Sequence, residues 1–379
     1  MSDVSNASLA RNLRRLFVET SEMAVRINSL LRDVAYLSGA EYCPGYPAVF
    51  EVEPTTLCAM RCTHCPRPTQ LDRPMMHMSP ETFTRVGQEI LPCAQNIYGT
   101  EGEATLSICF MHYGEPALTP HYEHGIRVFK KLGLRVISSS TSSEFSEKIA
   151  QAAVSAGLDE LWLIFDGMDD ETFKRMRGPR AGFEEGLACL ERLQAIKRIQ
   201  GAAKPAITAV MIRHPYNRHQ WPLFDEFFGN WAGVQHYLGH LSTFSGRQPS
   251  LLADLASLMD DPATCREQQR VAELNAKPCR YPWHSVCVLA DGRVVPCCRD
   301  INGDMVLGDL TRQSLAEIWN GPSMLALRRA LAVGDRANAL CNSCREASLE
   351  IGIPHAVDRT FLDQWLAQGE DGNSPEATA

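Results

Sequence analysis

The chain has 379 residues, a length that suits a barrel-sized domain with an appended module, and a formal net charge of -8. This acidic balance, with no Lys/Arg cluster beyond Arg11 to Arg15, argues against an extended nucleic-acid footprint. No apolar run approaches the roughly 20 residues that a membrane-spanning helix needs, and no secretory signal pattern precedes the first helix. We therefore expect a soluble, cytoplasmic protein with no nucleic-acid or membrane partner, whose 14 cysteines serve metal ligation rather than disulfides.

The first elements are helical. Residues 7–38 carry apolar side chains at helical spacing and end at Gly39, which predicts an amphipathic helical extension. A strand follows at residues 48–52, and Ser79-Pro80 begins a helix because a capping residue precedes Pro at the first helical position.

Strands and helices then alternate along the middle of the chain. We expect strands at residues 104–113, 135–139, 159–166, 206–212 and 234–241, and helices at 121–132, 143–156, 183–199 and 217–228. Six strand-helix units in a row predict a parallel sheet with helices on its outer face, because parallel strands need crossover connections. The alternation alone does not distinguish a partial barrel from a doubly wound open sheet.

The C-terminal third has a different pattern. Residues 286–289 and 294–295 are apolar strands around an Asp-Gly turn and predict a hairpin, and helical stretches follow at 314–319 and 323–331. The predicted organisation is a helical extension, a barrel, a linker, a metal-binding module and a tail that is disordered in part. These parts span residues 1–47, 48–246, 247–278, 279–350 and 351–379.

Three cysteines follow the first predicted strand at a spacing that carries chemistry. Cys58, Cys62 and Cys65 form a Cys-x3-Cys-x2-Cys motif. Thiolates are the usual ligands of iron-sulfur clusters, and a cubane held by three of them keeps one iron open for a small molecule. The alternative is zinc, but no nearby Cys or His completes the usual four ligands, since His64 lies between the cysteines.

This motif closely resembles the signature of the radical S-adenosylmethionine (SAM) enzymes. The resemblance implies a partial (β/α)6 TIM-like barrel, an α/β fold, with a 4Fe-4S cluster that binds SAM and cleaves it to a 5'-deoxyadenosyl radical. His112-Tyr113-Gly114-Glu115-Pro116 resembles the family's Gly-Glu-Pro motif, which receives the amino group of SAM. The resemblance also implies SAM contacts at further positions: His64, Gly114, Glu115, Pro116, Ser140, Thr141 and Asp166.

A second set of cysteines, Cys279, Cys297, Cys341 and Cys344, lies near the C-terminus. Four ligands suit structural zinc or a fully coordinated 4Fe-4S cluster, and the spacing does not decide between them. The segment resembles the SPASM and shortened "twitch" modules of radical SAM enzymes, which implies one auxiliary 4Fe-4S cluster. Its spacing is similar to that of the radical SAM dehydrogenases of aminocyclitols. Cys298 is an alternative ligand to Cys297, and Cys265 and Cys287 are further candidates.

Two such clusters suit the oxidation of an alcohol. We expect hydrogen abstraction from a sugar, an aminocyclitol or a similar metabolite, with the auxiliary cluster as electron acceptor and an external one-electron donor such as flavodoxin or ferredoxin. A base near the hydroxyl is required, and the candidates are His240 and Arg247, with Arg213 and His214 as others.

One alternative function is that of a maturase that crosslinks or epimerises a ribosomal peptide. Another is a non-catalytic metal-binding scaffold.

Overall fold

The computed structural model describes residues 21–98, 106–244, 248–275, 278–338, 340–342 and 344. These residues all belong to one compact unit of the chain, Met1–Leu349. The predicted tail at 351–379 and the first part of the predicted helical extension, residues 7–20, lie outside the described residues. No helix among the described residues is both long enough and apolar enough to cross a membrane.

A nine-stranded sheet forms the centre of this unit, in the order β6-β5-β4-β3-β2-β1-β7-β8-β9. Six parallel strands build the barrel portion, and β7 joins β1 in parallel before β8 and β9 add antiparallel pairs. The strands are β1 Val49–Val52, β2 Ser107–Phe110, β3 Arg135–Thr141, β4 Glu160–Ile164, β5 Ala206–Ile212, β6 Val234–Gly239, β7 Ser285–Val288, β8 Arg293–Val295 and β9 Gly308–Asp309. Because β6 and β9 are the two edges, the barrel is partial, as the sequence predicted.

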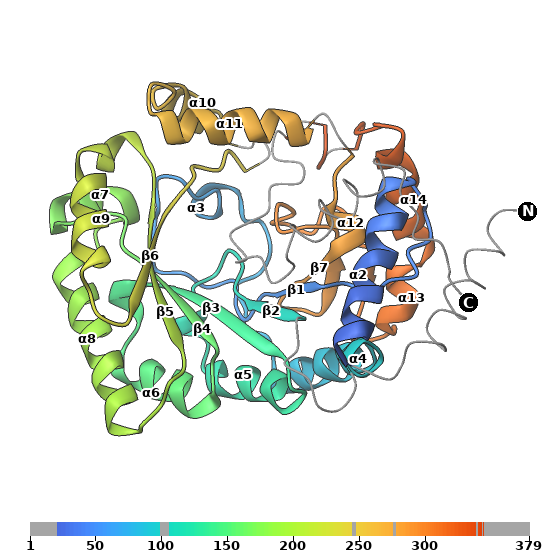
Figure 1. Cartoon of the computed structure of the whole chain (residues 1–379), viewed down its shortest axis with the longest axis horizontal. Helices are drawn as coiled ribbons and strands as arrows, with labels where there is room; N and C mark the ends of the chain where they lie inside the picture. The colour runs from blue at the N-terminus through green and yellow to red at the C-terminus, as the bar shows by residue number, and fades with distance from the viewer. Residues whose placement is uncertain are drawn as a thin grey trace, which may run out of the picture. The chain divides into compact units, whose positions relative to one another are not determined.

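Helices cover the outer face of the curved sheet, as Figure 1 shows for α5, α6, α8 and α9. The helices are α2 Ser21–Leu37, α3 Arg67–Gln70, α4 Pro80–Tyr98, α5 Tyr122–Lys131, α6 Glu147–Ala156, α7 Asp170–Arg177, α8 Phe183–Ile199, α9 Trp221–Gly229, α10 Pro249–Ala256, α11 Pro262–Asn275, α12 Tyr281–His284, α13 Leu315–Trp319 and α14 Pro322–Ala332. Short 3-10 turns η1 Pro116–Leu118, η2 Ser142–Glu144 and η3 Pro215–Gln220 follow β2, β3 and β5.

Side-chain alternation assigns the two faces of the sheet. Phe110 of β2 is fully buried and stacks on Phe83 of α4 at 5.6 Å between ring centroids, so this row of side chains faces the outer helices. The next row, which includes Cys109 and Glu51 at paired positions, must then face the concave inner side. The aromatic row supplies the core, and the inner row supplies polar groups to the site.

Several sequence predictions need correction. Of the strand expected at 104–113, the structure describes residues 106–113, and among these Ser107–Phe110 forms the strand. The sequence reading missed α7, which follows β4, and the segment predicted as a linker contains α10 and α11. The hairpin of the C-terminal module is part of the barrel sheet, because β7 pairs with β1 over four residues.

Candidate active site

The loop after β1 carries the first three cysteines at the carboxyl ends of the parallel strands. Backbone hydrogen bonds join this loop to the last residues of α7. The amides of Arg61 and Thr63 donate to the carbonyls of Arg177 and Met176 at 3.0 and 2.9 Å. Within the loop, the Cys65 amide donates to the Cys62 carbonyl at 3.2 Å. The end of α7 therefore sets the conformation of the cysteine loop.

The three thiols lie in a desolvated environment. Cys62 is buried, and Cys58 and Cys65 are half-buried. Burial raises the pKa of Cys58 to about 11 and the pKa of Cys65 to about 12. Thiolates in such a place need a positive centre beside them, which a cluster iron supplies and which deprotonates coordinating thiols.

The Gly-Glu-Pro loop after β2 packs directly on the cysteine loop. The Glu115 amide donates to the Leu57 carbonyl at 2.7 Å, and a Cβ at Gly114 would lie 1.9 Å from the Thr55 carbonyl oxygen. Only glycine permits this approach. The Glu115 carboxylate accepts hydrogen bonds from the Thr141 amide at 2.9 Å and the Ala117 amide at 3.2 Å, and burial raises its pKa.

Arg177 connects the cysteine loop to the ends of β3 and β4. Its guanidinium donates to Asp166 at 2.6 Å and, at 3.4 Å each, to the Cys62 sulfur and the Thr141 hydroxyl. The second oxygen of Asp166 accepts from the Ile212 amide at 2.8 Å. Both Asp166 oxygens are therefore bound by protein groups, so this residue orients Arg177. Ser140 is buried, and its hydroxyl donates to the Thr141 carbonyl at 3.0 Å.

His64 offers a neutral ring to the same site. Its side chain is 11% exposed, and its Nε2 lies 3.8 Å from Asp166. Burial lowers the pKa of His64 to about 4, so the imidazole is uncharged near neutral pH. Its buried Nδ1 has no hydrogen-bond partner among the described residues. The unpartnered nitrogen, the close approach at Gly114 and the three thiols together fit the SAM and cluster that the resemblance implies.

The second cysteine set also comes together. Burial raises the pKa of Cys297 well above its usual value, and the thiols of Cys298, Cys279 and Cys344 add to this. Cys341 has a raised pKa as well, with Cys344 among its neighbours. A tight turn joins these two, because the Cys344 amide donates to the Cys341 carbonyl at 3.2 Å. The sulfur of Cys298, the residue adjacent to Cys297, also lies 3.7 Å from the Tyr281 hydroxyl.

Neither cysteine set has the spacing of a zinc site. A tetrahedral zinc ion with Zn–S bonds of about 2.3 Å holds its thiolates about 3.8 Å apart. Within the described part of the chain, the only group of three His, Cys, Asp or Glu ligand atoms within 4.8 Å of one another contains none of these seven cysteines. A four-iron cluster, which binds each thiolate at a different iron, fits the wider spacing.

Polar side chains lie near both sets. Tyr113 is half-buried, its pKa is raised by desolvation, and its neighbours are Cys298, Arg299, Cys65 and Cys297. Tyr281 is half-buried as well, beside Cys298 and Arg299. Sequence reading missed Arg177, Tyr113, Tyr281 and Arg299. The only available signal was for Tyr113, which stands inside the motif before Gly114.

The predicted bases that the structure describes follow β5 and β6, and His214 lies near His64 and Asp166. His240, at the end of β6, places Nε2 3.7 Å from Glu267 of α11, and its other charged neighbours are Arg213, Arg270 and Asp261. Arg213 donates to the Leu238 carbonyl at 2.9 Å. His214 caps η3, where its Nδ1 accepts from the Tyr216 amide at 3.2 Å. Arg247 lies outside the described residues.

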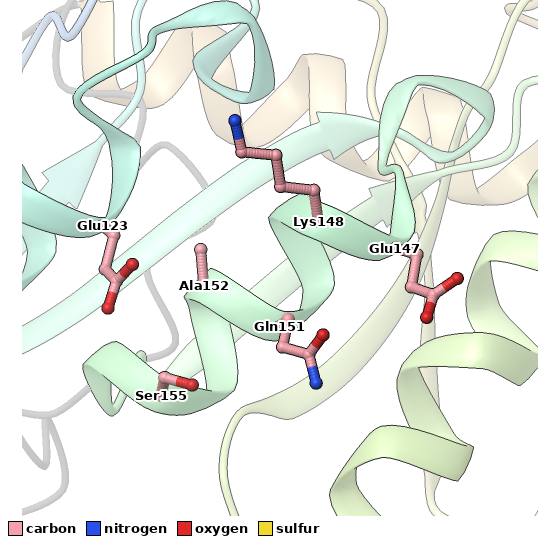
Figure 2. Close-up of a pocket in the computed structure, with 6 residues that line it drawn as sticks. All are labelled: Glu123, Glu147, Lys148, Gln151, Ala152 and Ser155. Carbon is pink, nitrogen blue, oxygen red and sulfur yellow. The ribbon is translucent and has the colours of Figure 1, made fainter.

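A surface hollow on the outer helices is a poor candidate for this chemistry. Figure 2 shows Glu123 of α5 facing five residues of α6 across it: Glu147, Lys148, Gln151, Ala152 and Ser155. None of the predicted site residues lines it, because these helices lie on the convex side of the sheet.

Comparisons with known proteins match both segments that carry the cysteine sets. Residues 52–212 match the model of the radical SAM superfamily, and residues 279–345 match SPASM, an iron-sulfur cluster-binding domain. The chain is 22% identical over 329 residues to the PqqA peptide cyclase of Gluconobacter oxydans, an alignment that covers 82% of this chain and 86% of that protein.

A shorter match reaches higher identity. The chain is 32% identical over 73 residues to the S-adenosyl-L-methionine-dependent 2-deoxy-scyllo-inosamine dehydrogenase of Niallia circulans, which covers 19% of this chain and 29% of that protein. The structure of Streptococcus suis SuiB bound to precursor peptide SuiA shares the fold, with a TM-score of 0.57 and 14% identity over 80% of this chain and 70% of that one. With its 4Fe-4S cluster, its SAM site and an auxiliary iron-sulfur domain, this chain is therefore a radical SAM enzyme with a C-terminal SPASM domain.

Proposed function

We propose that this enzyme oxidises a hydroxyl-bearing carbon of a polar small molecule, of the sugar or aminocyclitol class, to a ketone. The observation that carries the proposal is the grouping of thiols in the SPASM match. Cys297 lies near Cys279 and Cys344, and Cys341 lies near Cys344, while the sulfurs of Cys298 and Cys287 contact the Tyr281 hydroxyl and His112 Nδ1. This supports one auxiliary cluster, which fits a single two-electron oxidation.

When bound, the SAM cluster supplies a radical that abstracts hydrogen, and the auxiliary cluster supplies a one-electron acceptor. In the proposal, Cys58, Cys62 and Cys65 hold the first cluster. Glu115, fixed by the Thr141 amide, receives the SAM ammonium in a charge-assisted hydrogen bond. The neutral ring of His64 packs on the adenine, where an uncharged aromatic side chain can stack.

The substrate region is the polar space between the two cysteine sets. The half-buried Tyr113 and Tyr281 and the buried Arg299 offer hydroxyl and guanidinium groups to a polyhydroxylated molecule. His240 stays the candidate base, together with Glu267, since a neutral imidazole can accept a hydroxyl proton. An external one-electron donor such as a flavodoxin or ferredoxin completes the proposed system.

A second candidate function is the crosslinking of a precursor peptide. The alignment with PqqA peptide cyclase favours it, because it covers 82% of this chain, whereas the alignment with the dehydrogenase covers 19%.

The experiment is a deuterium-transfer assay. The anaerobically reconstituted enzyme is incubated with SAM, a reductant and a panel of carbinol-deuterated substrates: 2-deoxy-scyllo-inosamine, inositols and aminosugars. The proposal predicts deuterium in 5'-deoxyadenosine and a ketone product with at least one of them. It further predicts that a variant with Cys341 and Cys344 both changed to Ala still forms 5'-deoxyadenosine but no ketone. Deuterium transfer only from precursor peptides would replace the proposal with the second candidate.

A further inference from the structure

Three potential metal ligands meet on the inner side of the sheet, near Cys297 of the second cysteine set but with none of the seven cluster cysteines among them. They are Glu51 of β1, His112 after β2 and Cys287 of β7, and their ligand atoms all lie within 4.8 Å of one another. The Cys287 sulfur is 3.8 Å from His112 Nδ1, which is 4.0 Å from a Glu51 oxygen. The side chains of His112 and Glu51 are 1% and 13% exposed, and Cys287 is 1% exposed.

The strand register brings this group together. Glu51 and Cys287 are paired positions of the parallel strands β1 and β7, so their side chains leave the sheet on the same face. Cys109 of β2 is the paired position on the other side of Glu51. His112 follows β2 by two residues and precedes Gly114 by two. The group therefore lies at the edge of the sheet that carries the SAM motif.

The donor set is one that zinc prefers. Zinc binds thiolate sulfur at about 2.3 Å and imidazole nitrogen or carboxylate oxygen at about 2.0–2.2 Å, which places tetrahedral ligand atoms about 3.3–3.6 Å apart. Two of the separations, 3.8 and 4.0 Å, lie within about 0.7 Å of these values, and the third is no longer than 4.8 Å.

Charge favours a divalent cation at this position. When deprotonated, Glu51 and Cys287 carry two negative charges, of which the neighbouring Arg299 guanidinium offsets part of that on Glu51. Burial lowers the pKa of His112 to about 4, which leaves its imidazole neutral and able to ligate. A cation with two positive charges would neutralise the carboxylate and the thiolate together.

We propose that Glu51, His112 and Cys287 form a zinc-type metal site, whose ligands are distinct from the seven cysteines assigned to the iron-sulfur clusters. Three protein ligands leave one position of a tetrahedral ion open to water or to an oxygen of a small molecule, as in catalytic zinc sites. The proposal goes beyond the proposed function and does not depend on it.

The test is zinc binding by the iron-sulfur holoprotein. Anaerobically reconstituted protein is incubated with zinc sulfate, desalted and analysed for both iron and zinc, and the zinc environment is measured by X-ray absorption. The parent should retain about one zinc ion per chain, with one sulfur neighbour among nitrogen and oxygen neighbours. Removal of a side chain that only hydrogen-bonds to a metal ligand lowers metal affinity about 10–100-fold. Cys287→Ser and His112→Gln change the ligands themselves, so each should weaken zinc binding at least that much.

Cys109→Ser is the matched control, because Cys109 is buried in the same row beside Glu51 but lies outside the group. It should keep the zinc. Unchanged iron content in each variant shows that the fold and clusters are intact, which keeps the test independent of catalysis. A parent that retains no zinc, an all-sulfur zinc environment, or zinc retained by both ligand variants would overturn the proposal.

Discussion

At the scale of single residues, Arg177 organises the proposed SAM site. It is bound to Asp166, Cys62 and Thr141, which come from three different segments. Asp166 is fully buried, so its negative charge depends on the guanidinium. No feature of the sequence marks Arg177, because its role arises only when α7 returns to the cysteine loop.

Arg177→Gln tests this role. The change leaves Asp166 buried without its counter-charge, and breaking a buried pair in this way costs about 3–5 kcal/mol. We expect a lower melting temperature and loss of iron from the first cluster, both measured on reconstituted protein. Arg175→Gln is the control, since Arg175 is an exposed residue of the same helix. Equal iron content in the Arg177 variant and the parent would refute the assignment.

The neighbouring cysteines Cys297 and Cys298 have different predicted roles. Cys297 has Cys279 and Cys344 among its neighbours, and the Cys298 sulfur contacts the Tyr281 hydroxyl at 3.7 Å. Cys297→Ala should therefore lose about four irons per chain, and Cys298→Ala should lose none. Iron and sulfide analysis distinguishes the two variants. The reverse pattern would make Cys298 the ligand.

At the scale of secondary-structure elements, Glu53 joins the barrel to the SPASM domain. Its carboxylate accepts two hydrogen bonds from Arg73, at 2.8 and 2.7 Å, and one from the Ala290 amide at 2.9 Å. Arg73 in turn donates to the Ile301 carbonyl at 2.7 Å. The end of β1 is thereby bound to the segments that flank β8.

Glu53→Gln should destabilise the protein by about 3–5 kcal/mol, because it removes the charge that a buried Arg73 needs. Glu123→Gln breaks an exposed pair with Arg127 and should cost about 1 kcal/mol or less. Thermal unfolding of both variants gives the comparison. Similar melting temperatures for the two would mean that the Glu53 link contributes little.

The contact between α12 and α2 predicts a dependence on pH. Burial lowers the pKa of His284 to about 4, although Asp33 lies 2.9 Å away. The usual histidine pKa of about 6.5 applies to the unfolded chain, so between about pH 6.5 and 4 the unfolded state binds a proton that the native state does not. The free energy of unfolding then falls as pH falls, by up to about 1.4 kcal/mol per pH unit. His284→Gln should flatten the fall in melting temperature between pH 7.5 and 5. Parallel curves for the two proteins would contradict this.

At the scale of the whole molecule, sequence patterns predicted the barrel well and its connections poorly. The strand at 206–212 and the helix at 183–199 have the predicted bounds, because strong hydrophobic periodicity marks them. Helix α7 was missed because it is short and highly charged, with the sequence DETFKRMR. The β1–β7 pairing joins residues more than 230 positions apart, and no local signal encodes such a contact.

In the candidate site, too, residues in local motifs were predicted, and residues brought in by long-range contacts were not. Short motifs and the family resemblance they carry predicted the cysteines and Gly114-Glu115 as site residues, and the structure packs these two loops together. Tyr281, Arg299 and Glu51 reach the inner space only through the register of β1 with β7 and the turn after β8, so the sequence could not place them. His240, chosen for its position at a strand end, lies instead beside Glu267 of α11.

The central claim is that this chain holds two separate iron-sulfur clusters on two separate cysteine sets. The most direct measurement is the iron content of three anaerobically reconstituted proteins. They are the parent, a variant with Cys58, Cys62 and Cys65 all changed to Ala, and a variant with Cys279, Cys297, Cys341 and Cys344 all changed to Ala. The account predicts about eight irons in the parent and about four in each variant, with 5'-deoxyadenosine formed by the parent and the second variant only. About four irons in the parent and none in the first variant would contradict it, because the second cysteine set would then hold no cluster.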